Sequence, residues 1–276
     1  MPSTSSQAGR AAALTSRADG AGGRPATSNL ADQSLQQPAG RGARQLIGTV
    51  LGLYEDSRYK SESKKVHLKQ VDLIGFGSGL EVDQKLKYAN DLSSGVIFGR
   101  ELMNSPANVL TPAVLAEASK IASTYSDVFT ATVLDVEKCK ELKMGSYLGV
   151  AAASANPPHF IHLCYKLTGG NVRRKLAIVG KGLTFDSGYN IKTGPGCSIE
   201  LMKIDMGGSA AVFGAAKALG QIKPPGVEVH FIVAGCENMI SGTGMRTGDI
   251  VTASNGKTIE LCFFKHIVSA SNGSTH

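Results

Sequence analysis

Side chains of the types that bind metal ions or stabilise negative charge are concentrated between residues 175 and 209. They are Lys181, Asp186, Lys192, Lys203 and Asp205. Glycines at positions 188, 194, 196, 207 and 208 lie among them, and glycine lets the backbone approach a ligand closely. The apolar run 176–179 comes first and is short enough to be a fully buried strand. An active site has this composition, and so does a glycine-rich surface loop with solvated charges, so spacing alone leaves both interpretations open.

The order of the residues in this stretch adds a second kind of information. The segment VGKGLTFDSGYNIK, followed by ELMKIDMGGSAAV, resembles the leucyl aminopeptidase family of dinuclear metallo-exopeptidases, especially its plant members. The resemblance continues in NSPANVLTP (104–112), in SANPPHFIHLCYK (154–166) and from 227 to 260, about the middle three quarters of the chain. It implies an α/β fold with a mixed sheet flanked by helices, as part of the family's catalytic domain.

The resemblance also implies a reaction and roles for individual residues. Two divalent ions, Mn or Zn, activate a water molecule and polarise the peptide carbonyl. Asp186 corresponds to a ligand shared by both ions, Asp205 to a ligand of one ion, and Lys181 to an amine ligand in its neutral form. Lys192 corresponds to a charged group that stabilises the oxyanion. The implied protein is a homo-hexamer that releases amino-terminal residues, typically Leu, from peptides.

Two departures from the family pattern weaken the expected site. The family has DSGGYNIK where this chain has Asp186-Ser187-Gly188-Tyr189, one glycine fewer. Losing one residue from an extended segment reverses the direction of the side chains that follow, so we expect Lys192 to point away from the metals. After Glu260 the family continues with an NTDAEGRL motif, which carries two carboxylate ligands and the catalytic arginine, whereas this chain has LCFFKHIVSASNGSTH.

These departures predict a truncated family member without aminopeptidase activity. The alternative, from another functional class, is a non-catalytic assembly or chaperone-like module of the same family. The net charge of +7 suggests a third class, a nucleic-acid binder. However, the first 44 residues contain five arginines and two aspartates, so they supply +3 of that charge, and no nucleic-acid recognition motif is present. We therefore expect peptide partners and no nucleic acid.

Composition limits where the protein acts. No apolar run approaches the roughly 18 residues needed to cross a bilayer, so we expect no membrane span. The five cysteines are far apart and form no CxxC pair, which argues against a disulfide framework and a zinc ribbon. A reducing intracellular compartment follows, and we expect the cytoplasm. The plastid stroma is the alternative, because an Arg- and Ser-rich start with few acidic residues is typical of transit peptides.

The chain divides into four parts by composition and resemblance. Residues 1–44 have too few apolar residues to fold alone and form a disordered or transit-like tail. Residues 45–103 correspond to a remnant of the family's amino-terminal domain plus a linking helix, and residues 104–260 to the first half of the catalytic domain. Residues 261–276 form a divergent tail.

Hydrophobic periodicity and turn signals predict the elements within these parts. Helices are expected at 82–103, at 113–126 after a cap at Thr111, near 137–143, and after Asp205, which would cap the last one. Strands are expected at 71–75, 130–134, 160–165, 176–179 and 227–235, with a hairpin that turns at Asn255-Gly256. His159 and His162 lie three apart on a strand and face opposite sides, so they cannot share one ion, and we interpret both as structural.

Overall fold

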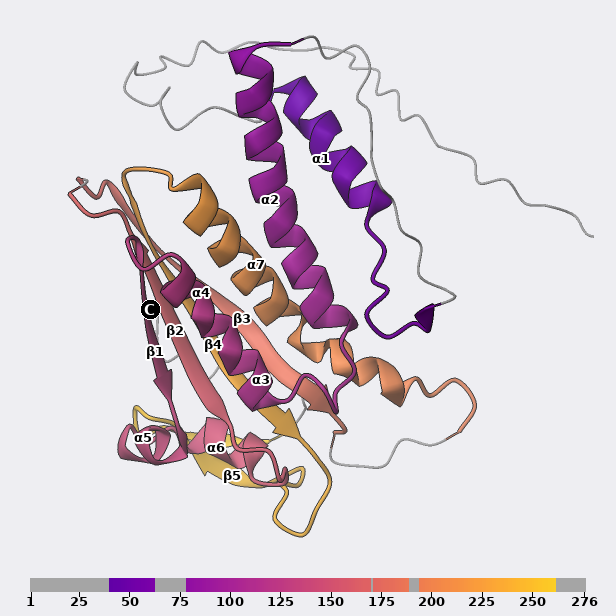
Figure 1. The fold of residues 1–276 in the computed structure, drawn as a ribbon. Helices are drawn as coiled ribbons and strands as arrows, with labels where there is room; N and C mark the ends of the chain where they lie inside the picture. Colours follow the sequence, from indigo (N-terminus) through magenta and orange to yellow (C-terminus); the bar gives the residue numbers. More distant parts are fainter. Residues whose placement is uncertain (1–39, 63–77, 170, 189–193, 262–276) are drawn as a thin grey trace, which may run out of the picture. The chain divides into compact units, whose positions relative to one another are not determined.

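The structure is a computed structural model that describes residues 40–62, 78–169, 171–188 and 194–261 (Figure 1). The helices are α1 (Arg41–Leu53), α2 (Leu80–Asn104), α3 (Pro112–Ala116), η3 (Glu117–Ser119), α4 (Lys120–Thr124), α5 (Val136–Glu141), α6 (Gly145–Ala151), η4 (Ile199–Met206) and α7 (Gly207–Ile222). The strands are β1 (Phe129–Leu134), β2 (His159–Lys166), β3 (Arg174–Asp186), β4 (Val227–Asn238), β5 (Ile250–Thr252) and β6 (Thr258–Glu260). No helix within these ranges is both long and apolar enough to span a bilayer.

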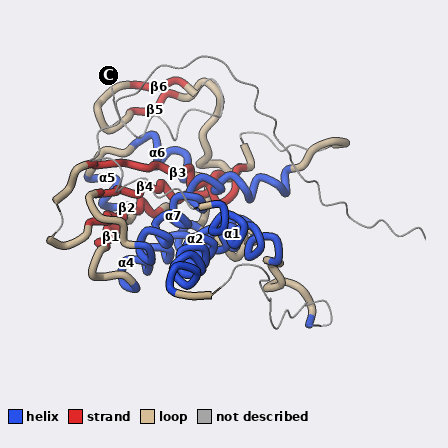
Figure 2. The backbone as a smooth tube through the Cα atoms, turned by 90° about the horizontal axis from the view of Figure 1, so that it is seen from above, coloured by secondary structure: helices blue, strands red, loops and turns tan. Residues whose placement is uncertain are grey.

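Four strands form one mixed sheet in the order β1-β2-β4-β3. β1 pairs antiparallel with β2, and β2 pairs antiparallel with β4, whereas β3 runs parallel to β4. Helices α2 and α7 lie on one side of the sheet, and α5, α6 and the β5–β6 hairpin lie on the other (Figure 2). This arrangement confirms the predicted α/β class with a mixed sheet flanked by helices.

Alternating side chains of β2 and β4 build the main core. Because successive side chains of a strand point to opposite faces, every second residue of each strand is directed at α3, α4 and α7. These residues are almost completely buried: Ile161, Leu163, Tyr165, Val229, Phe231 and Val233. A second cluster forms where α5 and α6 cover one end of the opposite face, with Tyr147, Leu183, Cys236 and Leu261 among its members.

Helices α2 and α7 contact each other through glycine. A Cβ atom on Gly95 of α2 would lie 2.4 Å from the carbonyl oxygen of Gly214 in α7, and one on Gly99 would lie 2.9 Å from that of Ala210. These distances are shorter than any contact a side chain tolerates, so the helices lie this close only because both positions lack a side chain. The resulting close packing fixes the position of α7 relative to the C-terminal half of α2.

Most predicted helices and strands are present in the structure, but several begin or end at other residues than predicted. Residues 41–44, which composition places in the tail, form the first turn of α1, where Ala43 is buried. The helix expected over 113–126 is divided into α3, η3 and α4, although Thr111 caps it as expected by accepting a hydrogen bond from the Val114 N–H. The strand expected at 71–75 lies outside the described residues.

The first half of β3 overturns one expectation. The apolar run 176–179 was predicted to be a fully buried strand, but Leu176, Ile178 and Val179 are 48%, 38% and 45% exposed. The reason is topological, because β3 lies at an edge of the sheet and pairs only with β4 among the described strands. The second half of β3 is largely buried, since η4 and α7 pack against it. An exposed apolar edge of this kind invites pairing with another chain.

The contact between α2 and α7 predicts that Gly95→Ala destabilises the fold. The new methyl group overlaps a backbone carbonyl, and overpacking of this kind typically costs about 1–3 kcal/mol. Gly48→Ala in α1 is the matched control, because a Cβ there meets nothing within 4 Å and alanine favours helix by about 0.8–1.0 kcal/mol. Urea unfolding should show opposite signs for the two variants. Equal stabilisation would mean that α2 and α7 are not held at this distance.

The exposed edge of β3 predicts self-association that a charge suppresses. We expect Ile178→Lys to reduce light scattering by concentrated protein, because lysine on an edge strand disfavours strand pairing. Ile240→Lys is the control, since Ile240 is similarly exposed at 41% but lies in the loop after β4. If both variants scatter as the parent chain does, the β3 edge is not the surface through which copies associate.

Candidate functional site

The candidate site begins at the carboxyl ends of the parallel strands β3 and β4. Asp186 ends β3 and lies opposite Asn238, which ends β4. The Asn238 amide donates a hydrogen bond of 2.8 Å to Asp186 Oδ1, and the Gly188 N–H donates one of 3.1 Å to the same oxygen. Gly188 has a φ of +74°, a conformation that glycine adopts without strain. The Asp186 carboxylate is therefore held through one oxygen.

The other Asp186 oxygen faces a lysine that bridges to a second carboxylate. Lys181 Nζ lies 4.0 Å from Asp186 Oδ2 and donates a hydrogen bond of 2.9 Å to Asp205 Oδ2. Asp205 belongs to η4, which leads directly into α7. This approach of η4 and α7 to β3 requires glycine, because a Cβ on Gly180 would lie 2.7 Å from the Gly208 carbonyl oxygen.

Within the cluster, Asp186 is a buried carboxylate that lies beside the partly exposed carboxylate of Asp205. Burial raises the pKa of Asp186, and the neighbouring Asp205 carboxylate raises it further, while the hydrogen bonds from Asn238 and Gly188 oppose the shift. Asp186 is only 8% exposed. A buried carboxylate beside a second carboxylate is a common feature of functional sites, because a bound cation offsets the desolvation and the repulsion between the two negative charges.

The structure brings together three of the four predicted site residues. Lys181, Asp186 and Asp205 form one cluster, and Lys192 lies outside the described residues. The expectation that Asp205 caps α7 is wrong. The residue before α7 is Met206, with no side-chain cap, and the Asp205 carboxylate instead accepts from Lys181.

Asn238 is a site residue that the sequence did not reveal. Its position directly after an apolar run was the available signal, because the carboxyl ends of neighbouring parallel strands meet at one edge of a sheet. Its backbone carbonyl also accepts hydrogen bonds of 3.0 Å from both the N–H and the hydroxyl of Ser187. Next to it, the buried Glu237 accepts from Ser154 and Asn156, an arrangement that orders the loop before β2.

The two histidines of β2 do not join the site. The His159 ring contacts the Pro157 carbonyl, whereas His162 forms a 2.9 Å hydrogen bond to His230 on the neighbouring strand. Burial, together with His230, lowers the pKa of His162. The two rings therefore have separate partners, and their purely structural role stays a prediction.

The cluster offers few donor atoms to a metal ion. Within the described ranges, no three His, Cys, Asp or Glu side chains gather closely enough to hold a metal ion. The cluster has two carboxylates, and Lys181 supplies a nitrogen as the third donor. These oxygen and nitrogen donors suit one divalent cation. The raised pKa of Asp186 agrees with this, because a bound cation would favour its ionised form. The donors are too few for the two ions that the resemblance implies.

The structure also contains a cavity of about 380 Å³ between α2 and α7, but it is separate from this cluster. Its lining is almost entirely apolar, with Arg100 as its one charged residue. The guanidinium of Arg100 already donates to the Leu51 carbonyl. The cavity therefore offers no group suited to hydrolysis, and we place the chemistry at the Lys181, Asp186 and Asp205 cluster.

Comparisons with known proteins point to one family. The family described as "Cytosol aminopeptidase family, catalytic domain" matches residues 97–262. The chain is 93% identical over 216 residues to "Leucine aminopeptidase 2, chloroplastic" of Oryza sativa subsp. japonica, covering 78% of this chain and 36% of that protein. It is 81% identical over 216 residues to "Leucine aminopeptidase 1" of Arabidopsis thaliana, covering 78% of this chain and 42% of the relative.

A solved structure gives the same answer for the fold. A mutant of tomato leucine aminopeptidase matches with a TM-score of 0.71 and 62% sequence identity, over 79% of this chain and 41% of that one. The chain thus spans about two fifths of the length of the relatives that it matches.

The burial of the Asp186 carboxylate beside Asp205 predicts that Asp186→Asn stabilises the chain at neutral pH. Because its pKa in the folded chain is above the value in the unfolded chain, Asp186 binds more protons when folded, so its ionisation lowers the free energy of unfolding as the pH rises above about 4. We expect urea unfolding to show a higher free energy of unfolding for the variant at pH 7, with the difference shrinking toward pH 4. Asp127→Asn is the control, since the hydrogen bond from Lys223 lowers the pKa of Asp127, and it should give no gain. A gain independent of pH would refute the account.

Proposed function

The chain belongs to the cytosol aminopeptidase family, and on this basis we propose that its Lys181, Asp186 and Asp205 are the metal-binding part of a metal-dependent aminopeptidase site. The observation that carries the proposal is the meeting of these three side chains beside the carboxyl ends of β3 and β4. Substrates would be peptides, from which the site would release amino-terminal residues such as Leu.

The geometry suggests a different role for each residue of the cluster and its neighbours. A bound divalent ion, Mn or Zn, would polarise the substrate carbonyl and acidify a water molecule. Asn238 and the Gly188 N–H orient the Asp186 carboxylate and direct Oδ2 into the cluster. Lys181 holds the Asp205 carboxylate toward β3 by donating a hydrogen bond to it. Lys192 remains a proposed oxyanion-stabilising residue.

We propose that this chain alone does not turn over peptides. Its described donors suit one ion, and the proposed activity requires two. A specific observation favours the second candidate function, a non-catalytic assembly or chaperone-like module: the apolar first half of β3 is exposed along an edge that pairs with no other strand in the described part of the chain. The homo-hexamer of the family is likewise a proposal for this chain.

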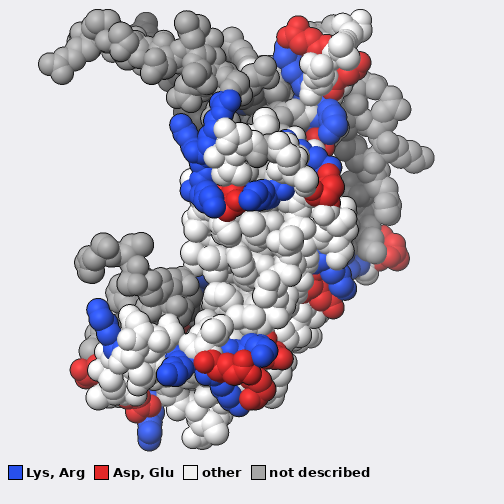
Figure 3. All heavy atoms as spheres, turned by 90° about the vertical axis from the view of Figure 1, so that its left-hand side faces the viewer, with Lys and Arg blue, Asp and Glu red and all other residues white. Residues whose placement is uncertain are grey.

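Charged side chains of both signs are mixed on one face of the described residues (Figure 3). On the face shown in Figure 3, lysine and arginine side chains lie beside aspartate and glutamate side chains, and a largely uncharged area separates the charged regions. Nucleic-acid footprints are typically basic over one continuous patch. For localisation, the word "chloroplastic" in the name of the rice relative favours the plastid stroma over the cytoplasm.

Metal binding without turnover is the expected result for the purified 276-residue chain. Mn²⁺ titrated by calorimetry should bind, and Asp186→Ala should abolish the binding, because it removes the central carboxylate. Asp127→Ala is a matched control on the exposed surface. Leucyl-aminomethylcoumarin should not be hydrolysed with or without Mn²⁺. If the chain hydrolyses the substrate, and if a chelator abolishes and Mn²⁺ restores this activity, the chain forms a complete active site. If Asp186→Ala binds Mn²⁺ as tightly as the parent chain does, the cluster is not the metal site.

A further inference from the structure

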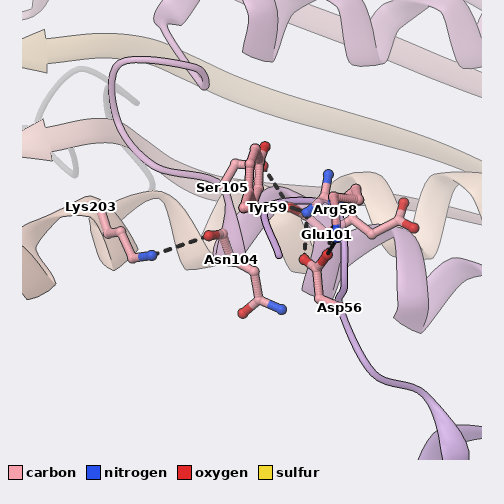
Figure 4. A network of polar contacts seen from close by, with 7 residues as sticks. All are labelled: Asp56, Arg58, Tyr59, Glu101, Asn104, Ser105 and Lys203. Carbon is pink, nitrogen blue, oxygen red and sulfur yellow. Dashed lines mark hydrogen bonds and ion pairs between the residues drawn. The ribbon is translucent and has the colours of Figure 1, made fainter. Parts of the chain in front are cut away.

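The C-terminal end of α2 is held by polar contacts from a segment before the helix and from Lys203 of η4 (Figure 4). The last carbonyl groups of a helix have no partner within the helix and need donors from elsewhere. In α2 these donors come from two directions, from residues 54–60 before the helix and from η4 after β3. Cations at this end also interact favourably with the helix dipole.

Arg58 holds the end of α2 from the first direction. Its Nη2 donates a 2.5 Å hydrogen bond to the Glu101 carbonyl, while Nε and Nη2 donate bonds of 2.9 and 2.6 Å to Asp56. The Asp56 side chain is 9% exposed, and its hydrogen bond from Arg58 lowers its pKa to about 2. A bidentate pair fixes the plane of the guanidinium and thereby its direction toward the helix. Tyr59 adds a hydroxyl bond of 3.2 Å to Ser105.

Lys203 holds the same end of α2 from the second direction. Its Nζ donates a 3.1 Å hydrogen bond to the Asn104 carbonyl, three residues after Glu101 in the last turn of the helix. Lys203 belongs to η4 and precedes Asp205 by two residues. Packing supports the same connection, since a Cβ on Gly207 would lie 3.4 Å from the Met103 sulfur.

We propose that Arg58 and Lys203 are positioning residues of the Lys181, Asp186 and Asp205 cluster: together they fix the last turn of α2, and through it η4 and Asp205. In this arrangement a segment before residue 97, outside the range that the family match covers, contributes to the geometry of the site. The metal-binding consequence rests on the proposed function, whereas the mechanical consequence for η4 does not.

Hydrogen exchange of the full chain tests the mechanical consequence. We expect Arg58→Met and Lys203→Met to raise amide exchange in residues 199–206 about tenfold, because each loses a charge-assisted hydrogen bond to α2. Arg58→Lys should give an intermediate effect, since the lysine ammonium keeps the positive charge and can still donate hydrogen bonds but lacks the planar guanidinium that forms the bidentate pair. Arg246→Met and Lys120→Met change exposed residues of the same types and should leave this segment as in the parent chain.

The segments in which amide exchange becomes faster decide whether the proposal holds. Faster exchange in 199–206 relative to the core strand residues 229–233 supports the proposal. An equal rise in both segments shows general destabilisation, and a rise confined to 54–60 and 101–105 shows that Arg58 acts only locally; either result overturns the proposal.

Titration with Mn²⁺ alone tests the consequence for the site. The two methionine variants should bind Mn²⁺ about tenfold more weakly than the parent chain, and the two controls should bind as the parent does. Unchanged Mn²⁺ affinity together with faster exchange in η4 would show that the position of η4 does not matter to the metal, which overturns the functional half of the inference. If the parent chain binds no Mn²⁺, the proposed function fails, and the exchange measurement still decides whether Arg58 and Lys203 fix η4.

Discussion

β3 runs parallel to β4, and a parallel pair requires a crossover connection between the two strands. In this chain η4 and α7 provide the crossover, so that the element after β3 returns along the sheet before β4 begins. The pairing places Asp186 opposite Asn238, and the crossover places Asp205 within reach of Lys181. The candidate site is therefore a consequence of one strand pairing and of the close approach that Gly180 and Gly208 permit between β3 and α7.

The same geometry has an energetic cost. It buries Asp186 beside a second carboxylate and gives the pair one amine as an opposing charge. A chain selected only for stability would replace such a carboxylate with a neutral or apolar side chain, since burying charge is unfavourable unless it is fully paired. The retained cluster is consistent with a site adapted to a cation, where an added positive charge turns an unfavourable arrangement into a favourable one.

The sequence predicted those features that depend on local chemistry. Thr111 and Pro112 marked a helix start because a cap needs a short hydroxyl side chain and proline suits the first turn. Asn255-Gly256 marked the hairpin because Asn-Gly favours tight hairpin turns with positive φ, and Gly256 has a φ of +82°. The grouping of Lys181, Asp186 and Asp205 followed from resemblance. What failed depended on neighbours distant in sequence: burial of 176–179 depends on whether a further strand lies beside β3, and the role of Asp205 depends on where Lys181 lies.

The contacts of Arg58 and Asn238 were also beyond prediction for this physical reason. A hydrogen bond to a backbone carbonyl, such as that of Glu101, leaves no trace in the residue type of the acceptor. The two halves of β3 likewise have opposite environments, and the apolar composition of 176–179 indicates burial for the half that is in fact exposed. The second half, covered by η4 and α7, bears the polar cluster, and the first half bears an apolar edge. Catalysis-related and assembly-related hypotheses thus concern different halves of one strand, the covered half with the polar cluster and the exposed apolar half.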